Sequence, residues 1–191
     1  MHAQNNWVTL TYNDANLPKP PNVEKTVIQN FLKKLRKKVK PFRYFIVGEY
    51  GDQTWRPHYH CCFFGLGWED NYYIFNEWAR CDREGYQFGE ISAESARYTA
   101  GYTTAKLTKK KDLKKYGLEK EFMLSSRKNG GIGYPAIVQV AKKWKNSKWR
   151  DDRIIRDLKN GRIDRPLGRY LTLKLSELLK IPQEKFDQEY W

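Results

Sequence analysis

Long apolar runs, cysteines and histidines are all scarce in this sequence of 191 residues. No stretch without an Asp, Glu, Lys or Arg is longer than 13 residues, whereas a membrane-spanning helix needs about 20 predominantly apolar residues. The first residues show no basic-then-apolar pattern, so we expect no signal peptide, no membrane association and a cytoplasmic location. The length supports one domain that buries a core without disulfides or a structural metal.

The three cysteines are Cys61, Cys62 and Cys81. An odd number without Cys-x-x-Cys spacing argues against a disulfide framework and a cysteine-based zinc site, and it fits a reducing compartment. The histidines are equally few, because only His2 accompanies His58 and His60. A two-histidine phosphoesterase needs a second histidine motif, so that enzyme class is disfavoured.

Positive charge and aromatic side chains are abundant instead. The chain has 36 Lys and Arg against 22 Asp and Glu, a net charge of +14, together with 7 Trp, 13 Tyr and 9 Phe. The bases concentrate in three segments, 33–43, 106–128 and 142–165. One such segment is typical of a solvated helix face, but three of them among aromatics favour a polyanion, because phosphate neutralisation and base stacking need both residue types. We therefore predict a nucleic-acid partner.

Hydrophobic periodicity predicts an α+β fold. Strands are expected over 7–12, 42–50, 58–66, 86–91 and 121–125, and helices over 23–39, 76–81, 92–107 and 136–144. Asn22 and Ser92 are the expected N-caps, and a final hairpin is expected around Asn160 and Gly161. This order predicts a single domain over 1–191, with a central, mostly antiparallel sheet of about five strands flanked by helices. The segment after about residue 134 is a less certain C-terminal extension.

A His-x-His pair lies on the third predicted strand. Residues two apart on a strand project from the same face, so both imidazoles of His58 and His60 point the same way. The other face of that strand carries Tyr59, Cys61 and Phe63, which we expect in the core. The pair therefore suits two ligands of one divalent ion, although two surface histidines remain an alternative.

A carboxylate is expected next to this pair. Antiparallel pairing across the hairpin at 51–57 brings Glu49 within reach of His58 or His60 on the same face. Two imidazoles and one carboxylate leave coordination positions open, as in a catalytic metal site. Asp14 is a rival carboxylate that no strand pairing places, and Cys62 is interpreted as a small buried filler rather than a ligand.

Two tyrosines share one side of the helix expected over 92–107. Tyr98, Tyr102 and Lys106 follow one another at four-residue spacing, which stacks them along one helix side. Such spacing is commonly mere packing. The small residues Ala93, Ala96, Ala100, Gly101 and Ala105 would, however, let the helix lie close to a sheet, and the long polar side chains would then reach an active site.

These motifs together resemble a known family. The segment 56–60, following 48–51, resembles the His-hydrophobe-His motif of the HUH endonucleases, and the Tyr98-x-x-x-Tyr102 helix resembles the paired tyrosines of their two-tyrosine class. The strand at 7–12 and the glycine segment at 131–133 resemble the replication initiators of gokushovirus-like microviruses, which are small single-stranded DNA phages. The resemblance covers the chain from Trp7 to about Tyr134.

The resemblance implies an HUH-like fold and a nickase that initiates rolling-circle replication. A tyrosine would attack origin DNA, leaving a 5′-phosphotyrosine and a free 3′-hydroxyl, and the strand would be rejoined at termination. Glu49, His58 and His60 would hold Mn²⁺ or Mg²⁺, with Tyr98 and Tyr102 as nucleophiles and Lys106 stabilising the phenolate or the phosphate.

The same resemblance extends to partners. Single-stranded origin DNA, a host helicase and the replication machinery would be engaged, in the host bacterial cytoplasm for a phage-encoded protein. The expected nucleic-acid-binding residues are Arg56, Lys33, Lys34, Lys37, Lys109, Lys110 and Lys111.

Two other functions stay open at this point. A transposase or relaxase of the same superfamily would use one tyrosine, and the dispensability of either tyrosine would favour it. A non-catalytic nucleic-acid-binding domain would use the aromatics for base stacking and leave the histidines incidental. The absence of metal-dependent nicking would favour that second function.

Overall fold

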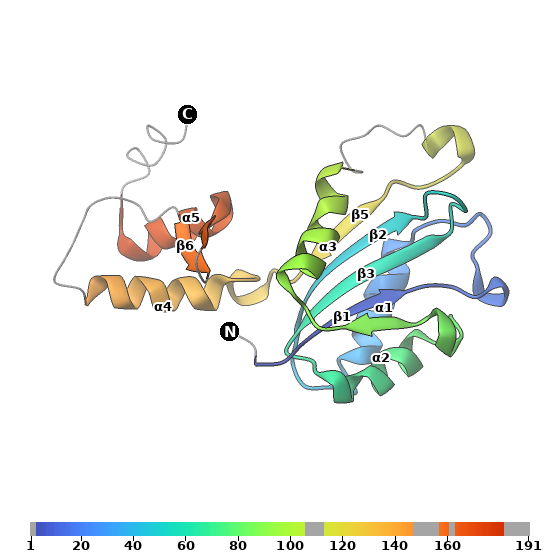
Figure 1. Ribbon diagram of the computed structural model, residues 1–191, viewed down its shortest axis with the longest axis horizontal. Coiled ribbons are helices and arrows are strands. Elements are labelled where there is room, and N and C mark those ends of the chain that lie inside the picture. The colour runs from blue at the N-terminus through green and yellow to red at the C-terminus, as the bar shows by residue number, and fades with distance from the viewer. Residues whose placement is uncertain (1–2, 106–112, 147–156, 161–162, 182–191) are drawn as a thin grey trace. The chain divides into compact units, whose positions relative to one another are not determined.

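The computed structural model describes residues 3–105, 113–146, 157–160 and 163–181. The chain divides into two compact units, one up to Ser126 and one from Arg127 onward (Figure 1). Each unit is described here by itself, and the assignment of 1–191 to a single nicking domain stays a prediction. Within the described residues, no helix combines the length and the apolar character that crossing a membrane requires.

The first unit is built around a five-stranded sheet in the order β4-β1-β3-β2-β5, with every neighbouring pair antiparallel. This confirms the predicted α+β class and the number of strands. The strands are β1 (Asn5–Leu10), β2 (Arg43–Tyr50), β3 (Pro57–Phe64), β4 (Gln87–Gly89) and β5 (Phe122–Ser125).

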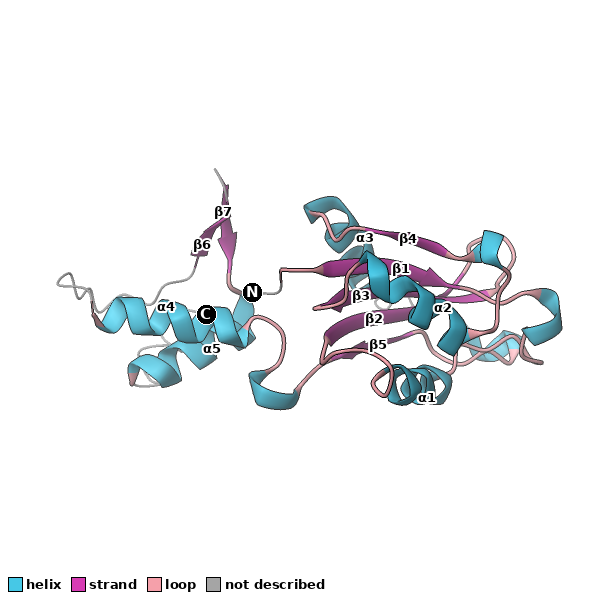
Figure 2. Ribbon diagram, turned by 90° about the horizontal axis from the view of Figure 1, so that it is seen from below, coloured by secondary structure: helices cyan, strands magenta, loops and turns pink. Residues whose placement is uncertain are grey.

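Three helices accompany this sheet: α1 (Lys25–Leu35), α2 (Asn71–Trp78) and α3 (Ala93–Ala105). Short 3-10 helices lie at Asp14–Asn16, Trp68–Asp70, Arg83–Gly85 and Leu113–Tyr116. Figure 1 shows α1 behind the sheet and α3 in front of it, and Figure 2 shows the same strands from below.

The two faces of the sheet follow from the alternation along β3. Tyr59, Cys61 and Phe63 are fully buried in one core cluster with the apolar side of α1, as the sequence predicts. The contributing side chains of α1 are Ile28, Phe31, Leu32 and Leu35. His58, His60 and Cys62 therefore project from the opposite face, on which α3 lies.

The two expected N-caps have different outcomes. The Ser92 hydroxyl accepts a hydrogen bond from the Ser95 backbone N–H at 3.0 Å, so this cap is confirmed. The Asn22 cap is wrong, because α1 begins at Lys25 and Glu24 occupies the N-cap position without a side-chain cap. Asn22 instead accepts from the Glu119 backbone N–H, 2.9 Å from its Oδ1, and from the hydroxyl of Tyr50.

Two helix boundaries also differ from expectation. The helix expected over 23–39 ends at Leu35. The helix expected over 76–81 begins earlier, at Asn71, and ends at Trp78. Its start follows a tight turn in which the Gly67 backbone N–H donates to Asp70 Oδ2 at 2.8 Å. That turn, rather than apolar periodicity, decides where α2 begins.

The second unit contains α4 (Tyr134–Lys145), β6 (Asp157–Asn160), β7 (Ile163–Pro166) and α5 (Gly168–Leu179), with a 3-10 helix at Lys128–Gly130. α4 and α5 bury Ile137, Ala141 and Leu175 between them. β6 and β7 pair antiparallel as the expected hairpin, with Asn160 opposite Ile163, while Gly161 lies outside the described residues. The sequence analysis did not predict α5.

Candidate active site

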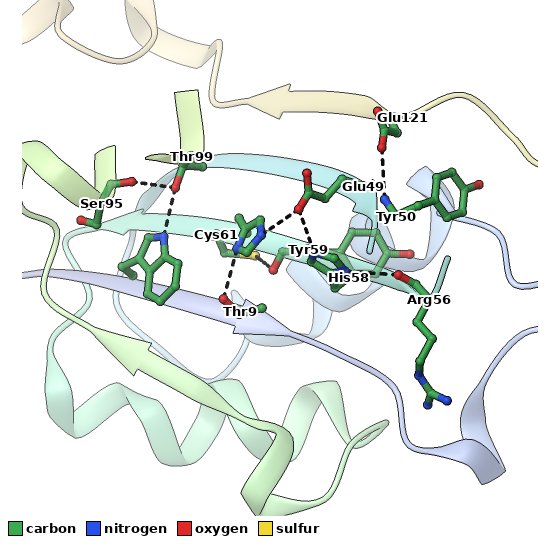
Figure 3. A network of polar contacts seen from close by, with 12 residues as sticks. Thr9, Glu49, Tyr50, Arg56, His58, Tyr59, Cys61, Ser95, Thr99 and Glu121 are labelled. Atoms are coloured by element: carbon green, nitrogen blue, oxygen red, sulfur yellow. Dashed lines mark hydrogen bonds and ion pairs between the residues drawn. The ribbon is translucent and has the colours of Figure 1, made fainter. Parts of the chain in front are cut away.

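Three side chains converge where β2 and β3 meet the hairpin between them. The register sets Glu49 opposite His58 and Val47 opposite His60, so the carboxylate lies on the histidine face. Glu49 Oε1 is 2.7 Å from His58 Nε2 and 3.1 Å from His60 Nε2 (Figure 3). One ligand atom from each of the three residues lies within 4.8 Å of the others. The same-face geometry expected from the sequence is therefore present.

Oxygen atoms on the far side of each ring orient the two imidazoles. His58 Nδ1 lies 3.2 Å from the backbone carbonyl of Arg56, and His60 Nδ1 lies 3.1 Å from the hydroxyl of Thr9 (Figure 3). A carbonyl only accepts, so Nδ1 of His58 donates and leaves its Nε2 as the atom that faces Glu49. Metal-binding histidines are held in this way by partners on their other nitrogen.

The cluster is closed on the sheet side and more open at His58. The side chains of Glu49 and His60 are 3% and 5% exposed, whereas that of His58 is 20% exposed. Burial by itself raises the pKa of the Glu49 carboxyl, but the hydrogen bonds with His58 and His60 outweigh burial and lower this pKa to about 2. Glu49 is therefore a carboxylate at neutral pH.

The donor set fits a divalent ion. Two imidazole nitrogens and one carboxylate oxygen converge, and three protein ligands leave positions for a substrate oxygen. The rival carboxylate Asp14 lies elsewhere, because its Oδ1 accepts from Arg56 Nη1 at 2.6 Å. Cys62 is buried, with its Sγ 3.8 Å from Thr99 Oγ1, which fits the expected role as a small filler.

α3 brings one of the two tyrosines beside this cluster. The ring centroid of Tyr98 lies 5.3 Å from that of His60, edge-on at 82°, and Tyr98 is 50% exposed. A phenol accessible to solvent therefore stands next to the candidate metal ligands. Tyr102 occupies the next turn of α3, but its side chain lies outside the described ones, and Lys106 lies outside the described residues.

α3 faces the sheet differently from our expectation. Ala93, Ala96 and Ala100 are exposed, so these small residues do not mediate a close approach to the sheet. Thr99 is instead fully buried, and it accepts a hydrogen bond from the indole of Trp7 at 3.0 Å. A hydrogen-bonded threonine, rather than an alanine face, holds the helix on the sheet.

Comparison with known proteins adds a family to this geometry. Residues 5–111 match the family model of the replication-associated protein ORF2. The chain belongs to this family.

Two curated members of the family are similar in sequence. Replication-associated protein ORF2 of Spiroplasma virus 4 is 36% identical over 154 residues, which cover 69% of this chain and 47% of that protein. Replication-associated protein VP4 of Bdellovibrio phage phiMH2K is 30% identical over 131 residues, covering 56% and 40%. The chain thus spans about half the length of these relatives, or less. No solved structure matches the chain.

The residues expected to bind nucleic acid are dispersed in this replication-associated protein. Lys33, Lys34 and Lys37 are exposed on or just after α1, across the sheet from the histidines. The guanidinium of Arg56 contacts Asp14 and donates to the backbone carbonyl of Tyr12 at 2.8 Å. Lys109, Lys110 and Lys111 lie outside the described residues. No single basic surface can therefore be drawn from the described part of this set.

Sequence analysis missed three residues that support the site of this family member. Trp7 and Thr9 lie on the histidine face of β1, and both contact His60. Their two-residue spacing was a usable signal, because alternate residues of a strand share a face. Thr99 gave no such signal, since its partner Trp7 is 92 residues away in the chain.

Proposed function

We propose that this protein nicks single-stranded origin DNA through a tyrosine and so initiates rolling-circle replication, with Mn²⁺ or Mg²⁺ as its cofactor. The observation that carries the proposal is the convergence of His58, His60 and Glu49 on one point beside Tyr98. Membership of the replication-associated family supports it independently.

The chemistry explains why a tyrosine would lie next to such a cluster. A free phenol has a pKa near 10, so only about 0.1% of it is ionised at neutral pH and it is a weak nucleophile. A divalent ion bound by the three ligands would supply the positive charge that polarises a phosphodiester and offsets the charge of the transition state. His58, His60 and Glu49 would hold that ion, and the contacts of both Nδ1 atoms would keep the rings oriented.

The step is a transesterification. The phenol oxygen of Tyr98 forms a bond to phosphorus as the bond from phosphorus to the 3′-oxygen breaks. The phenol gives up its proton and the leaving 3′-oxygen gains one. The products are a 5′-phosphotyrosine and a free 3′-hydroxyl, which primes synthesis by the host machinery after a helicase separates the strands. No ATP is needed, because the phosphoester is exchanged rather than hydrolysed.

Tyr102 is the proposed second nucleophile. At termination the enzyme is already held on one 5′ end and must cut a regenerated origin. A second phenol on the next turn of α3 would make that cut, and the new 3′-hydroxyl would attack the first phosphotyrosine to close a circle. Lys106 is the proposed stabiliser of the developing charge, while Arg56 and the lysines named above would contact phosphates.

Incubation with a circular single-stranded phage-type DNA and Mn²⁺ tests the proposal. We expect a protein–DNA adduct that survives SDS and does not form in EDTA. Formation of the adduct through only one dispensable tyrosine would indicate a single-tyrosine transposase or relaxase. Tight DNA binding without any adduct would indicate a non-catalytic binding domain.

A further inference from the structure

Trp7 on β1 contacts three parts of the candidate active site. Its ring stacks on that of His60 with centroids 5.8 Å apart and planes 15° apart. The same indole meets the ring of Tyr98 edge-on at 6.3 Å and 72°. Its Nε1 donates to Thr99 Oγ1 at 3.0 Å. One side chain therefore touches a candidate metal ligand, the candidate nucleophile and the helix that carries that nucleophile.

The contact with Thr99 fixes α3 at the turn that carries Tyr98. Thr99 is fully buried, and its hydroxyl donates to the Ser95 backbone carbonyl at 2.9 Å while accepting from Trp7. An indole N–H left without an acceptor inside a protein carries a desolvation penalty. Rotation or sliding of α3 would break this bond. The position of Tyr98, the adjacent residue, is thereby tied to β1.

The stacking contact acts on the metal side of the site. The Trp7 ring lies almost parallel to the imidazole of His60, and Thr9, two residues further along β1, holds the Nδ1 of the same imidazole. The His60 ring is thus fixed in both plane and rotation by side chains of β1. β1 therefore orients a candidate ligand and the nucleophile helix together.

We infer that Trp7 is a positioning residue that sets the distance between the tyrosine nucleophile and the metal site. This inference rests on the proposed function, since it assigns Tyr98 and His60 their roles in nicking. The stack serves the metal ligand, and the indole N–H serves the helix. The two roles are separable, because phenylalanine retains a stacking ring but has no donor.

The chain offers a matched control for this tryptophan. Trp78 is also buried, and its Nε1 donates to the Thr11 backbone carbonyl at 2.6 Å. Its ring packs against Tyr12, Phe31 and Tyr59 in the core on the opposite face of the sheet. Trp78→Phe therefore removes an indole hydrogen bond of the same kind without touching the active-site face.

The experiment compares Trp7→Phe, Thr99→Val, their double variant and Trp78→Phe in the full chain. For Trp7→Phe and Thr99→Val we expect the nicking rate at saturating DNA to fall by about tenfold or more, because small displacements of reacting groups are costly. The KM for DNA and the affinity for Mn²⁺ should stay within about threefold, since the stack on His60 is retained. Trp7→Ala should also weaken Mn²⁺ binding by about tenfold.

A double-variant cycle distinguishes positioning from packing. Both single variants remove the same hydrogen bond, so the double variant should lie within about twofold of the slower single one. Hydrogen exchange of the α3 amides gives a readout without metal or DNA, and it should accelerate in Trp7→Phe and Thr99→Val but not in Trp78→Phe. Additive losses, or unchanged α3 exchange together with unchanged nicking, would overturn the inference. Absence of nicking in the wild type would refute the proposed function alone, because the exchange measurement still tests the anchoring of α3.

Discussion

The two faces of the five-stranded sheet use neighbouring residues of one strand for opposite purposes. On the core face, Tyr59 is fully buried, its hydroxyl lies 3.2 Å from that of Tyr12, and burial raises its pKa well above the usual range. On the site face, His58 and His60 flank Tyr59 in sequence, and the half-exposed phenol of Tyr98 lies beside them. A phenol is inert or available according to the face on which it lies.

This comparison shows how the fold separates stability from chemistry. The core face packs aromatic rings of Tyr59, Phe63, Phe31 and Trp78 against one another. The site face instead gathers nitrogen and oxygen atoms that a dry core would not tolerate without partners. A change on one face should therefore affect folding, and a change on the other should affect nicking.

The largest expected effect is on the site face and concerns the two tyrosines of α3. Tyr98→Phe and Tyr102→Phe should each retain some single nicking but fail at repeated cut-and-join cycles, because each variant lacks a second nucleophile. The double variant should form no covalent adduct. Strand transfer with labelled oligonucleotides measures both properties.

The buried phenol supplies the control for that pair. Tyr59→Phe should keep nicking and cycling while it lowers the free energy of unfolding by about 1–2 kcal/mol, because the Tyr59 hydroxyl also accepts from the Glu24 backbone N–H. Unlimited cycling by Tyr98→Phe would make Tyr98 a packing residue and the protein a one-tyrosine enzyme.

The metal ligands come next in expected size. His58→Ala or His60→Ala should reduce nicking by about 10³-fold, because the charge that offsets the transition state is lost, while circular dichroism and DNA affinity stay largely unchanged. Glu49→Ala should act in the same direction, less completely. Cys62→Ala is the matched control, since Cys62 shares the strand and the face but not the cluster. Full activity in EDTA would refute the metal's role.

A core-face substitution should give the converse result. Phe63 is fully buried and its ring contacts those of Phe31 and Phe42. Phe63→Ala should lower the free energy of unfolding by about 3–5 kcal/mol through lost burial and a cavity. The Mn²⁺ affinity of the molecules that remain folded should not change. Urea unfolding and calorimetric titration below the transition would check both expectations, and a parallel loss of Mn²⁺ affinity would show that the faces are coupled.

The smallest expected effect concerns the basic residues of the α1 region. If Lys33, Lys34 and Lys37 contact phosphates, the logarithm of DNA affinity should fall linearly with the logarithm of salt concentration. Each lysine replaced by glutamine should reduce that slope by about 0.7 for a single strand. These lysines lie across the sheet from the histidines, so such contacts would require DNA on both faces. An unchanged slope would make this side of α1 an ordinary solvated surface.

The sequence was sufficient for the features that depend on strand alternation and on pairing across a short hairpin. The five strands, the core role of Tyr59 and the approach of Glu49 to His58 all follow from period-two patterns and one hairpin register. Family membership, expected from the motifs around His58 and Tyr98, is confirmed.

What the sequence did not predict depends on contacts between distant segments. Asn22 resembles a helix cap, yet a loop almost a hundred residues further on uses its side chain. The alanines of α3 resemble a packing face, yet the bond from Trp7 turns Thr99 toward the sheet instead. Local propensity carries no information about such partners, so these assignments failed although the strands were correct.

Electron paramagnetic resonance of bound Mn²⁺ tests the central claim most directly, namely that the site face holds one divalent ion on Glu49, His58 and His60. The wild-type protein should bind one Mn²⁺ with nitrogen hyperfine couplings from two imidazoles. His58→Ala and His60→Ala should each lose one of these couplings, and Cys62→Ala should retain both. Equal Mn²⁺ binding by a variant that lacks both histidines, or a spectrum without nitrogen couplings, would contradict the account.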